Sequence, residues 1–111
     1  MNQIDRLVEI IATYRKHGWN LRRVLLTIET GASCGEREKS SFADAKVEAS
    51  AIDALWFSRP SHEKREAWEL RLVAETPYAL FETFESDETE EQRQEVRCEM
   101  EARMREHTAK D

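Results

Sequence analysis

One short run of small residues contains the side chain best suited to nucleophilic chemistry. Residues 31–35 read Gly-Ala-Ser-Cys-Gly, a flexible sequence that could present the Cys34 thiol or bind an anion through its backbone amides. A nucleophilic thiol needs a histidine, a cation or a helix N-terminus to lower its pKa, and no signature of that kind surrounds Cys34. Glu36 follows directly, where a phosphate-binding loop would carry lysine. The sequence therefore favours a turn with an unreactive cysteine.

The residues that could bind a metal are scattered along the chain. The histidines are His17, His62 and His107, and neither Cys34 nor Cys98 belongs to a CxxC pair. A structural zinc site requires several such ligands at spacings that bring them together. We therefore expect no bound metal and no other cofactor.

Three charged residues interrupt segments that are rich in aromatic side chains: Glu69, Arg71 and Glu82. If some of them share a sheet face with Trp56 or Tyr78, they would form a polar patch with aromatic walls, suited to a small ligand or to acid–base catalysis. The water-facing positions of an antiparallel sheet explain the same pattern more simply, because one face of such a sheet is normally solvated.

Two groups of basic residues raise the question of nucleic-acid binding. Arg22 and Arg23 are adjacent, and residues 59–65 form a basic turn. If residues 20–28 were helical, Gly18 would join two helices, and the pair of arginines would lie on the second helix of a helix-turn-helix unit.

The distribution of charge argues against a nucleic-acid partner. Residues 1–81 contain 12 basic and 12 acidic side chains, whereas residues 82–111 contain 5 basic and 11 acidic ones. The whole excess of negative charge therefore belongs to the C-terminal segment. A protein that binds nucleic acid normally gathers a net positive face, which this chain lacks.

Length and composition limit the class of protein. The chain has 111 residues, of which 40% are hydrophobic and 36% charged, with a formal net charge of −6. These values predict one domain over residues 1–111 with a single modest core. The chain has neither a run of about 18 apolar residues nor the pattern of a secretory signal, and its two cysteines are far apart. We expect a cytoplasmic protein without disulfides.

The first element that must position these residues is an N-terminal helix. It begins behind Asn2 and ends at Gly18, which can adopt the left-handed conformation that terminates helices. Its apolar residues recur three and four positions apart, as on one face of an amphipathic helix: Ile4, Leu7, Val8, Ile11 and Tyr14.

Residues 20–28 fit two structures. Leu21, Val24, Leu25 and Ile28 match the helical period, but the stretch is short and the later strands need a partner, so we favour a strand with apolar residues on both faces. The next residues, to Ser41, read as a loop with room for a helical turn. The segment from Phe42 to Ser50 has too mixed a pattern to predict any element.

The second half of the chain predicts a meander followed by a helix. Residues 52–58, 68–74 and 78–84 are aromatic segments, the last two with alternating patterns, so they read as three antiparallel strands. Residues 86–107 read as a helix with acidic residues gathered at its start, where the helix dipole favours them. Its apolar stripe is narrow and contains Val96, Met100 and Met104.

The predicted fold is α+β, with an N-terminal helix, a small antiparallel sheet of three to four strands and an acidic C-terminal helix. Trp56 and Phe57 must point to opposite faces of their strand, as must Leu80 and Phe81. The N-terminal helix covers one face. Either the narrow stripe of the C-terminal helix or another subunit must cover the other.

This pattern predicts a non-enzymatic interaction or regulatory module that acts as a homodimer or docks onto a protein partner. No catalytic residue is predicted. The alternatives are a small-ligand-binding protein or enzyme that uses the polar patch or Cys34 and, less favoured, a DNA-binding regulator. The candidate ligand- or partner-binding residues are Trp56, Phe57, Trp68, Glu69, Arg71, Phe81 and Glu82.

Overall fold

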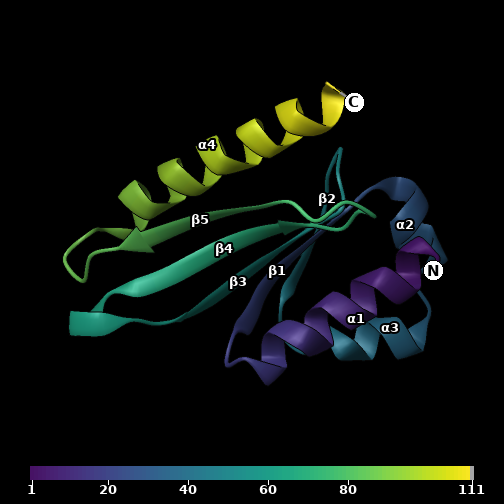
Figure 1. The fold of residues 1–111 in the computed structure, drawn as a ribbon, viewed down its shortest axis with the longest axis horizontal. Helices are drawn as coiled ribbons and strands as arrows, with labels where there is room; N and C mark the ends of the chain where they lie inside the picture. Colours follow the sequence, from purple (N-terminus) through teal and green to yellow (C-terminus); the bar gives the residue numbers. More distant parts are fainter. Residues whose placement is uncertain (111) are drawn as a thin grey trace.

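The computed structural model describes residues 1–110 as a five-stranded sheet with helices on both faces (Figure 1). The strands lie in the order β2-β1-β3-β4-β5, with β2 parallel to β1 and all other neighbours antiparallel. In chain order the helices and strands are α1 (Gln3–Lys16), β1 (Asn20–Leu26), α2 (Ile28–Ser33), α3 (Glu36–Ser41), β2 (Lys46–Ala49), β3 (Ala54–Pro60), β4 (Glu66–Leu72), β5 (Ala79–Phe84) and α4 (Glu90–Ala109). No helix within the described residues has the length and apolar character needed to cross a membrane.

The N-terminal helix is confirmed, including the residues predicted at its start and at its end. The Asn2 side chain accepts a hydrogen bond of 2.8 Å from the backbone N–H of Asp5, which satisfies one of the free amides of the first turn. Gly18 has a φ of +86°, a left-handed conformation that glycine adopts without steric cost.

The ambiguous stretch after this helix is a strand, as favoured. Strand β1 lies inside the sheet between β2 and β3. Val24 and Leu26 pack on the side of α1, whereas Leu25 packs on the side of α4, so both faces of the strand are buried.

The prediction of three to four antiparallel strands was wrong, because the sheet has five strands and is mixed. The additional strand is β2, whose only large apolar residue is Val47. Its pairing partner lies about twenty residues earlier in β1, so no local pattern reveals it. Two six-residue helices, α2 and α3, occupy most of the segment that was predicted to be a loop.

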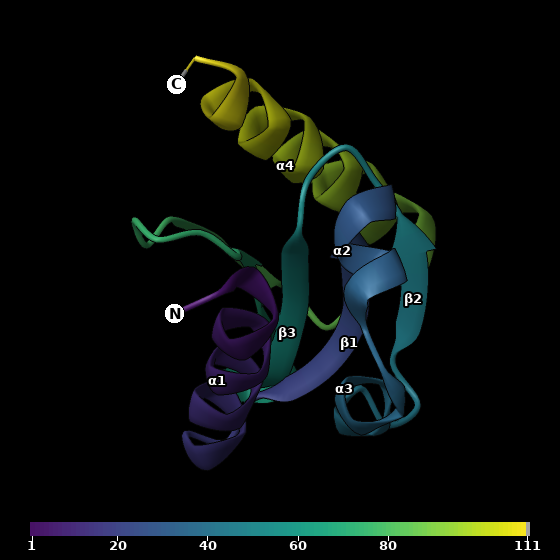
Figure 2. The ribbon, with the colours of Figure 1, turned by 90° about the vertical axis from the view of Figure 1, so that its right-hand side faces the viewer.

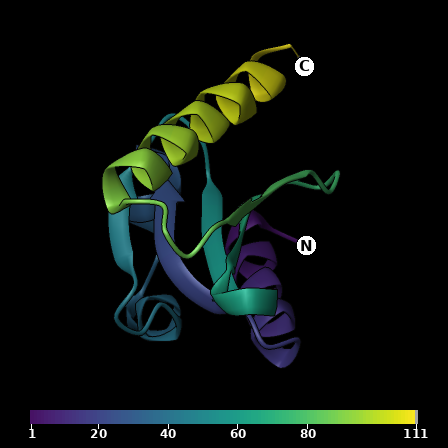
Figure 3. The same ribbon diagram turned by 90° about the vertical axis from the view of Figure 1, so that its left-hand side faces the viewer.

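Apolar residues emerge from both faces of the sheet, and the chain covers both faces with its own helices. In the side views α4 lies on one side of the strands, whereas α1 and α3 lie on the other (Figures 2 and 3). Trp56, Trp68 and Phe84 are buried in the core beneath α4, together with Met100 and Met104. The C-terminal helix therefore covers the second face, and the rings beneath it need no other subunit.

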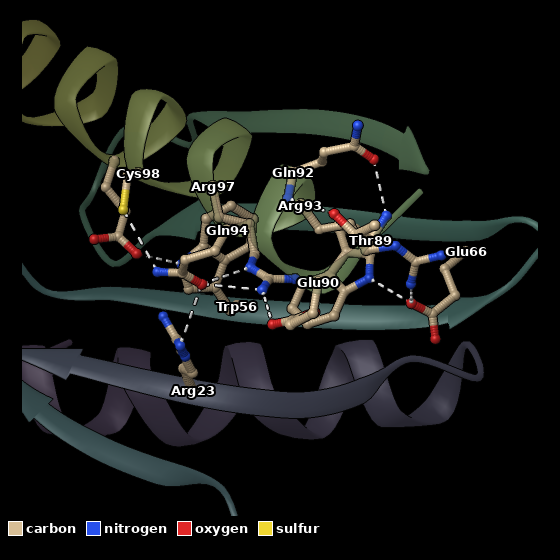
Figure 4. Close-up of polar contacts among 12 residues, drawn as sticks. Arg23, Trp56, Glu66, Thr89, Glu90, Gln92, Arg93, Gln94, Arg97 and Cys98 are labelled. Carbon is tan, nitrogen blue, oxygen red and sulfur yellow. Dashed lines mark hydrogen bonds and ion pairs between the residues drawn. The ribbon is translucent and has the colours of Figure 1, made fainter. Parts of the chain in front are cut away.

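Two arginines widen the narrow apolar stripe of α4. The Arg97 side chain is only 2% exposed, and its guanidinium lies 4.5 Å from the ring centre of Trp68. Arg93 lies over Phe84 at 5.7 Å and pairs with Glu66. Figure 4 shows both side chains reaching from α4 towards the strands. The arginine stems thus act as part of the hydrophobic contact while their charged ends are paired or hydrogen-bonded.

Candidate functional site

The structure separates the seven candidate residues into three groups. Trp56, Phe57 and Trp68 are buried in the two cores, so none of them lies at a free surface. Glu82 is opposite Trp68 in the β4–β5 ladder and therefore points to the α4 side of the sheet. The last group contains Glu69, Arg71 and Phe81, which all point to the α1 side.

These last three residues lie where the cover provided by α1 ends. Phe57, Glu69 and Phe81 are consecutive neighbours in a row across β3, β4 and β5. Tyr14 of α1 stacks on Phe57 with ring centres 4.1 Å apart, and its hydroxyl donates a hydrogen bond to the Glu69 carboxylate. The next ring in the row, Phe81, has no such cover and is 57% exposed. Phe81 is therefore an exposed apolar feature, whereas Phe57 in the same row is fully buried.

We use the name β5 face for the open part of the sheet on the α1 side. Its side chains are those of Glu69, Arg71, Ala79, Phe81 and Thr83. A groove of about 250 Å³ adjoins it, between α1 and the end of β4, and Arg6, Thr13, Tyr14 and Arg71 are among the residues that line it. The β5 face thus combines one apolar ring with a polar border.

The outer edge of β5 carries unpaired backbone groups. Leu72 donates its backbone N–H to the Tyr78 carbonyl at 2.9 Å, so the residues that exchange hydrogen bonds between β4 and β5 are the even-numbered ones. The N–H and C=O groups of Ala79, Phe81 and Thr83 point to the outside, and no hydrogen bond within residues 1–110 uses them. A free edge of this kind is a template for another strand.

The opposite edge of the sheet is protected. Strand β2 has four residues, and its charged side chains pair across it: Lys46 lies 3.6 Å from Glu48, which also lies 3.8 Å from Arg23 of β1. By contrast, β5 contains no lysine, arginine or proline, and its single charge, Glu82, points to the α4 side. Short length and charge are common means of preventing edge pairing, and only β2 has both.

The charged residues of the polar patch considered from the sequence are divided between the two faces of the sheet. Glu69 and Arg71 lie on one face of the sheet and Glu82 lies on the other, beside Trp68. The Glu69 carboxylate is engaged by Tyr14. The arrangement does not present two carboxylates to one site, which general acid–base catalysis by a carboxylate pair would require.

The other chemical candidates are also not supported by the geometry of the described residues. Burial raises the pKa of the Cys34 thiol, whereas a nucleophilic cysteine needs a lowered pKa. Residues 1–110 bring together no group of three or more histidine, cysteine or carboxylate side chains that could hold a metal ion.

The basic residues of β1 are engaged with the α4 side of the sheet. Arg22 lies over the Trp68 ring at 5.2 Å, and Arg23 contacts Gln94 of α4 and Glu48 of β2. Because β1 is a strand, the second helix of a helix-turn-helix unit is not formed there.

Tyr14 provides a test of the border of the β5 face. Burial and, to a smaller extent, the hydrogen bond to Glu69 raise the pKa of Tyr14 from 10.0 to about 12. The pKa of Tyr14 is therefore higher in the folded than in the unfolded state. The stability that comes from keeping this hydroxyl protonated is complete below pH 10 and is lost as the pH rises towards about 12. The free energy of unfolding, measured with urea across this range, should therefore fall less steeply in Tyr14→Phe than in the wild type. Equal slopes for the two proteins would contradict the raised pKa of Tyr14.

Sequence reasoning included Phe81 but missed the two features that define the surface. Tyr14 was assigned to the apolar face of the first helix, and nothing local indicates that it contacts Glu69, which is 55 residues away. The free edge of β5 follows from strand order, which the sequence did not reveal. A usable signal was the absence of lysine, arginine and proline from residues 79–84.

Comparisons with known proteins add no family assignment. The chain has no significant match among protein-family models, curated proteins or solved structures. The inference of function therefore depends on the geometry of this chain alone.

Proposed function

We propose that the protein is a small self-associating module, in which β5 of one copy pairs with β5 of a second copy. The observation that carries this proposal is the exposed Phe81 ring on a strand whose outer backbone groups are unpaired. Strand addition at a free sheet edge satisfies those backbone groups, while the side chains on each face determine which partner fits.

The outward-pointing residues select one symmetric antiparallel register. Only Ala79, Phe81 and Thr83 offer their backbone groups to a new strand. A twofold axis that passes beside Phe81 uses all three, because Phe81 then lies opposite Phe81 of the second copy and Ala79 lies opposite its Thr83. The two exposed rings become a cross-strand aromatic pair, a contact that stabilises sheets.

The same register avoids a clash of charge. Glu82 is the single charged residue of β5. With Phe81 at the axis, Glu82 lies opposite Leu80 of the second copy, so the two Glu82 carboxylates do not face each other. Keeping these carboxylates apart matters because the protein has a net charge of −6, which already opposes close approach of two copies.

The expected dimer is weak. Each copy contributes one strand and one aromatic ring to the proposed contact, because Phe81 is the one exposed phenylalanine, tyrosine or tryptophan among the described residues. Interfaces below about 1,200 Å² of total buried area are typical of transient association. We therefore expect monomers and dimers in exchange, with the dimer favoured as the protein concentration rises.

Sedimentation velocity over about a hundredfold range of protein concentration tests the proposal. The wild type should shift from monomer towards dimer as the concentration rises. Phe81→Lys should remain monomeric across the range, because it removes the aromatic pair and places two like charges opposite each other at the axis.

Val47→Lys provides the matched control at the other edge of the sheet. Val47 is 51% exposed on β2, close to the exposure of Phe81, and this variant should dimerise like the wild type. Circular dichroism and urea denaturation should show that both variants are folded. A monomeric wild type at every concentration would overturn the proposal, as would equal loss of the dimer in both variants.

A further inference from the structure

A second surface feature lies at the opposite edge of the sheet and does not depend on the proposed dimer. It is a pocket of about 310 Å³ between the short helices α2 and α3 and the strands β1 and β2. Small-molecule sites typically begin at about this volume and are mostly apolar with a few placed polar groups. Four of the eight residues that line it are Leu26, Cys34, Phe42 and Val47.

The fold leaves this pocket open because its helical cover is incomplete. The two helices beside it have six residues each, and Val47 on β2 remains half exposed. Leu26, Cys34 and Phe42 are buried, so they form an apolar interior beneath a partly open wall. The chain leaves α3 through Ala43, which also lines the pocket and has a φ of 53°. A left-handed alanine costs about 1 kcal/mol or more, and strained backbone of this kind is often found beside binding sites.

One charged side chain lines the pocket, and it is positive. Lys39 at the end of α3 makes no ion pair within the described residues, so its ammonium group is available to a ligand. Cys34, the other polar side chain of the lining, is a neutral thiol because burial raises its pKa. The lining therefore has an apolar interior with a single positive charge.

We propose that this pocket binds an aliphatic carboxylate of medium chain length. The hydrocarbon chain lies between Leu26, Phe42 and Val47, and the carboxylate pairs with Lys39. The apolar walls favour the chain through the hydrophobic effect, and the ammonium group distinguishes an anionic head from a neutral or cationic one.

Decanoate is the probe, and Cys34 is the reporter, because its thiol lies in the pocket wall. In a Cys98→Ser background, which leaves only this thiol, decanoate below its micelle concentration should slow alkylation of Cys34 in a saturable manner. At about ten times the Kd the rate should fall about tenfold by mass action. Decyltrimethylammonium, which has the same chain and the opposite charge, should protect much less.

Two variants test whether the protection of Cys34 comes from decanoate bound in the pocket. A Cβ at Gly31 would meet no atom within 4 Å, so the backbone there can carry a side chain, and Gly31→Leu should fill space along the pocket wall. This variant should abolish saturable decanoate binding, measured by NMR chemical-shift changes. Lys39→Met should raise the Kd about fivefold, the upper range for an exposed ion pair.

Lys16→Met is the matched control, since Lys16 is an exposed lysine at the end of α1 that does not line the pocket. It should bind decanoate like the wild type. The proposal is overturned if decanoate leaves Cys34 reactivity unchanged, or if it slows the exposed Cys98 of the wild type to the same extent. Equal effects of Lys39→Met and Lys16→Met would overturn the role of Lys39.

Discussion

Arg97→Ala should lower the free energy of unfolding by about 3 kcal/mol, a value typical of truncating a large buried side chain. The guanidinium of Arg97 is packed against Trp68 and Phe84 and hydrogen-bonded to Gln94 and Glu90. Alanine removes the stem that fills this space as well as the cation over the rings. Urea denaturation followed by tryptophan fluorescence measures the loss, because Trp68 lies directly beneath.

Arg97→Met separates packing from charge. Methionine retains most of the apolar stem and removes the charge together with its need for partners, so the loss should be only about 1 kcal/mol. Arg103→Ala, at an exposed position of the same helix, should change stability by less than about 0.5 kcal/mol. If Arg97→Ala were as mild as Arg103→Ala, Arg97 would have no role in attaching α4 to the sheet.

Asp53→Ala should lower the free energy of unfolding by about as much as Arg97→Ala, for a different reason. The Asp53 carboxylate accepts hydrogen bonds from the Gln3 side chain at 2.9 Å, the Thr27 backbone at 2.7 Å and the Thr30 hydroxyl at 2.6 Å. It thereby connects α1, the start of α2 and the entry to β3. Alanine leaves three donors without this acceptor, and hydrogen bonds to a charged group are worth about 1.5–3 kcal/mol each before any compensation by water. We expect a loss of about 3 kcal/mol in urea denaturation.

Asp53→Asn should show an intermediate loss, because the amide keeps one accepting oxygen but directs an N–H towards the remaining donors. Asp44→Ala removes an exposed carboxylate and serves as the control, with a change below about 0.5 kcal/mol. A loss for Asp53→Ala no greater than that for Asp44→Ala would show that water replaces the carboxylate without cost.

Strand β1 shows why periodicity alone was ambiguous. The register between β1 and β3 shifts between Leu21 and Arg23, which marks a bulge in the strand. The bulge places Leu21 and Val24 on the same side of the sheet although they are three residues apart, a spacing that resembles a helix turn. Ile28, which completed the apparent helical pattern, is exposed in α2. Length and the need for a partner strand were the better guides.

The C-terminal helix shows a second limit of reading apolar patterns. From the narrow stripe of Val96, Met100 and Met104 alone, either this helix or another subunit could have covered the second face of the sheet. The structure places Arg97 in the same contact, where its stem covers aromatic rings. Hydrophobic patterns count arginine as polar, so they underestimate any face on which a guanidinium stacks on an aromatic ring.

The β5 face was predicted only in part. The alternation in residues 78–84 places Phe81 and Leu80 on different faces of the strand, and this much follows from the sequence. Whether Phe81 is covered depends on how far α1 extends across the sheet, and that depends on the contacts of Tyr14 with Phe57 and Glu69. Such contacts join residues more than forty positions apart, so no local pattern contains them.

The position of α4 along the chain affects how the protein is made. The ribosome synthesises residues 1–84 before α4, the helix that covers Trp56, Trp68 and Phe84. Until α4 is available, three large rings of the sheet are without its cover, and neighbouring chains can associate through them. A chain that ends after residue 84 should therefore scatter more light than the full chain at the same concentration, because these aromatic rings stay uncovered.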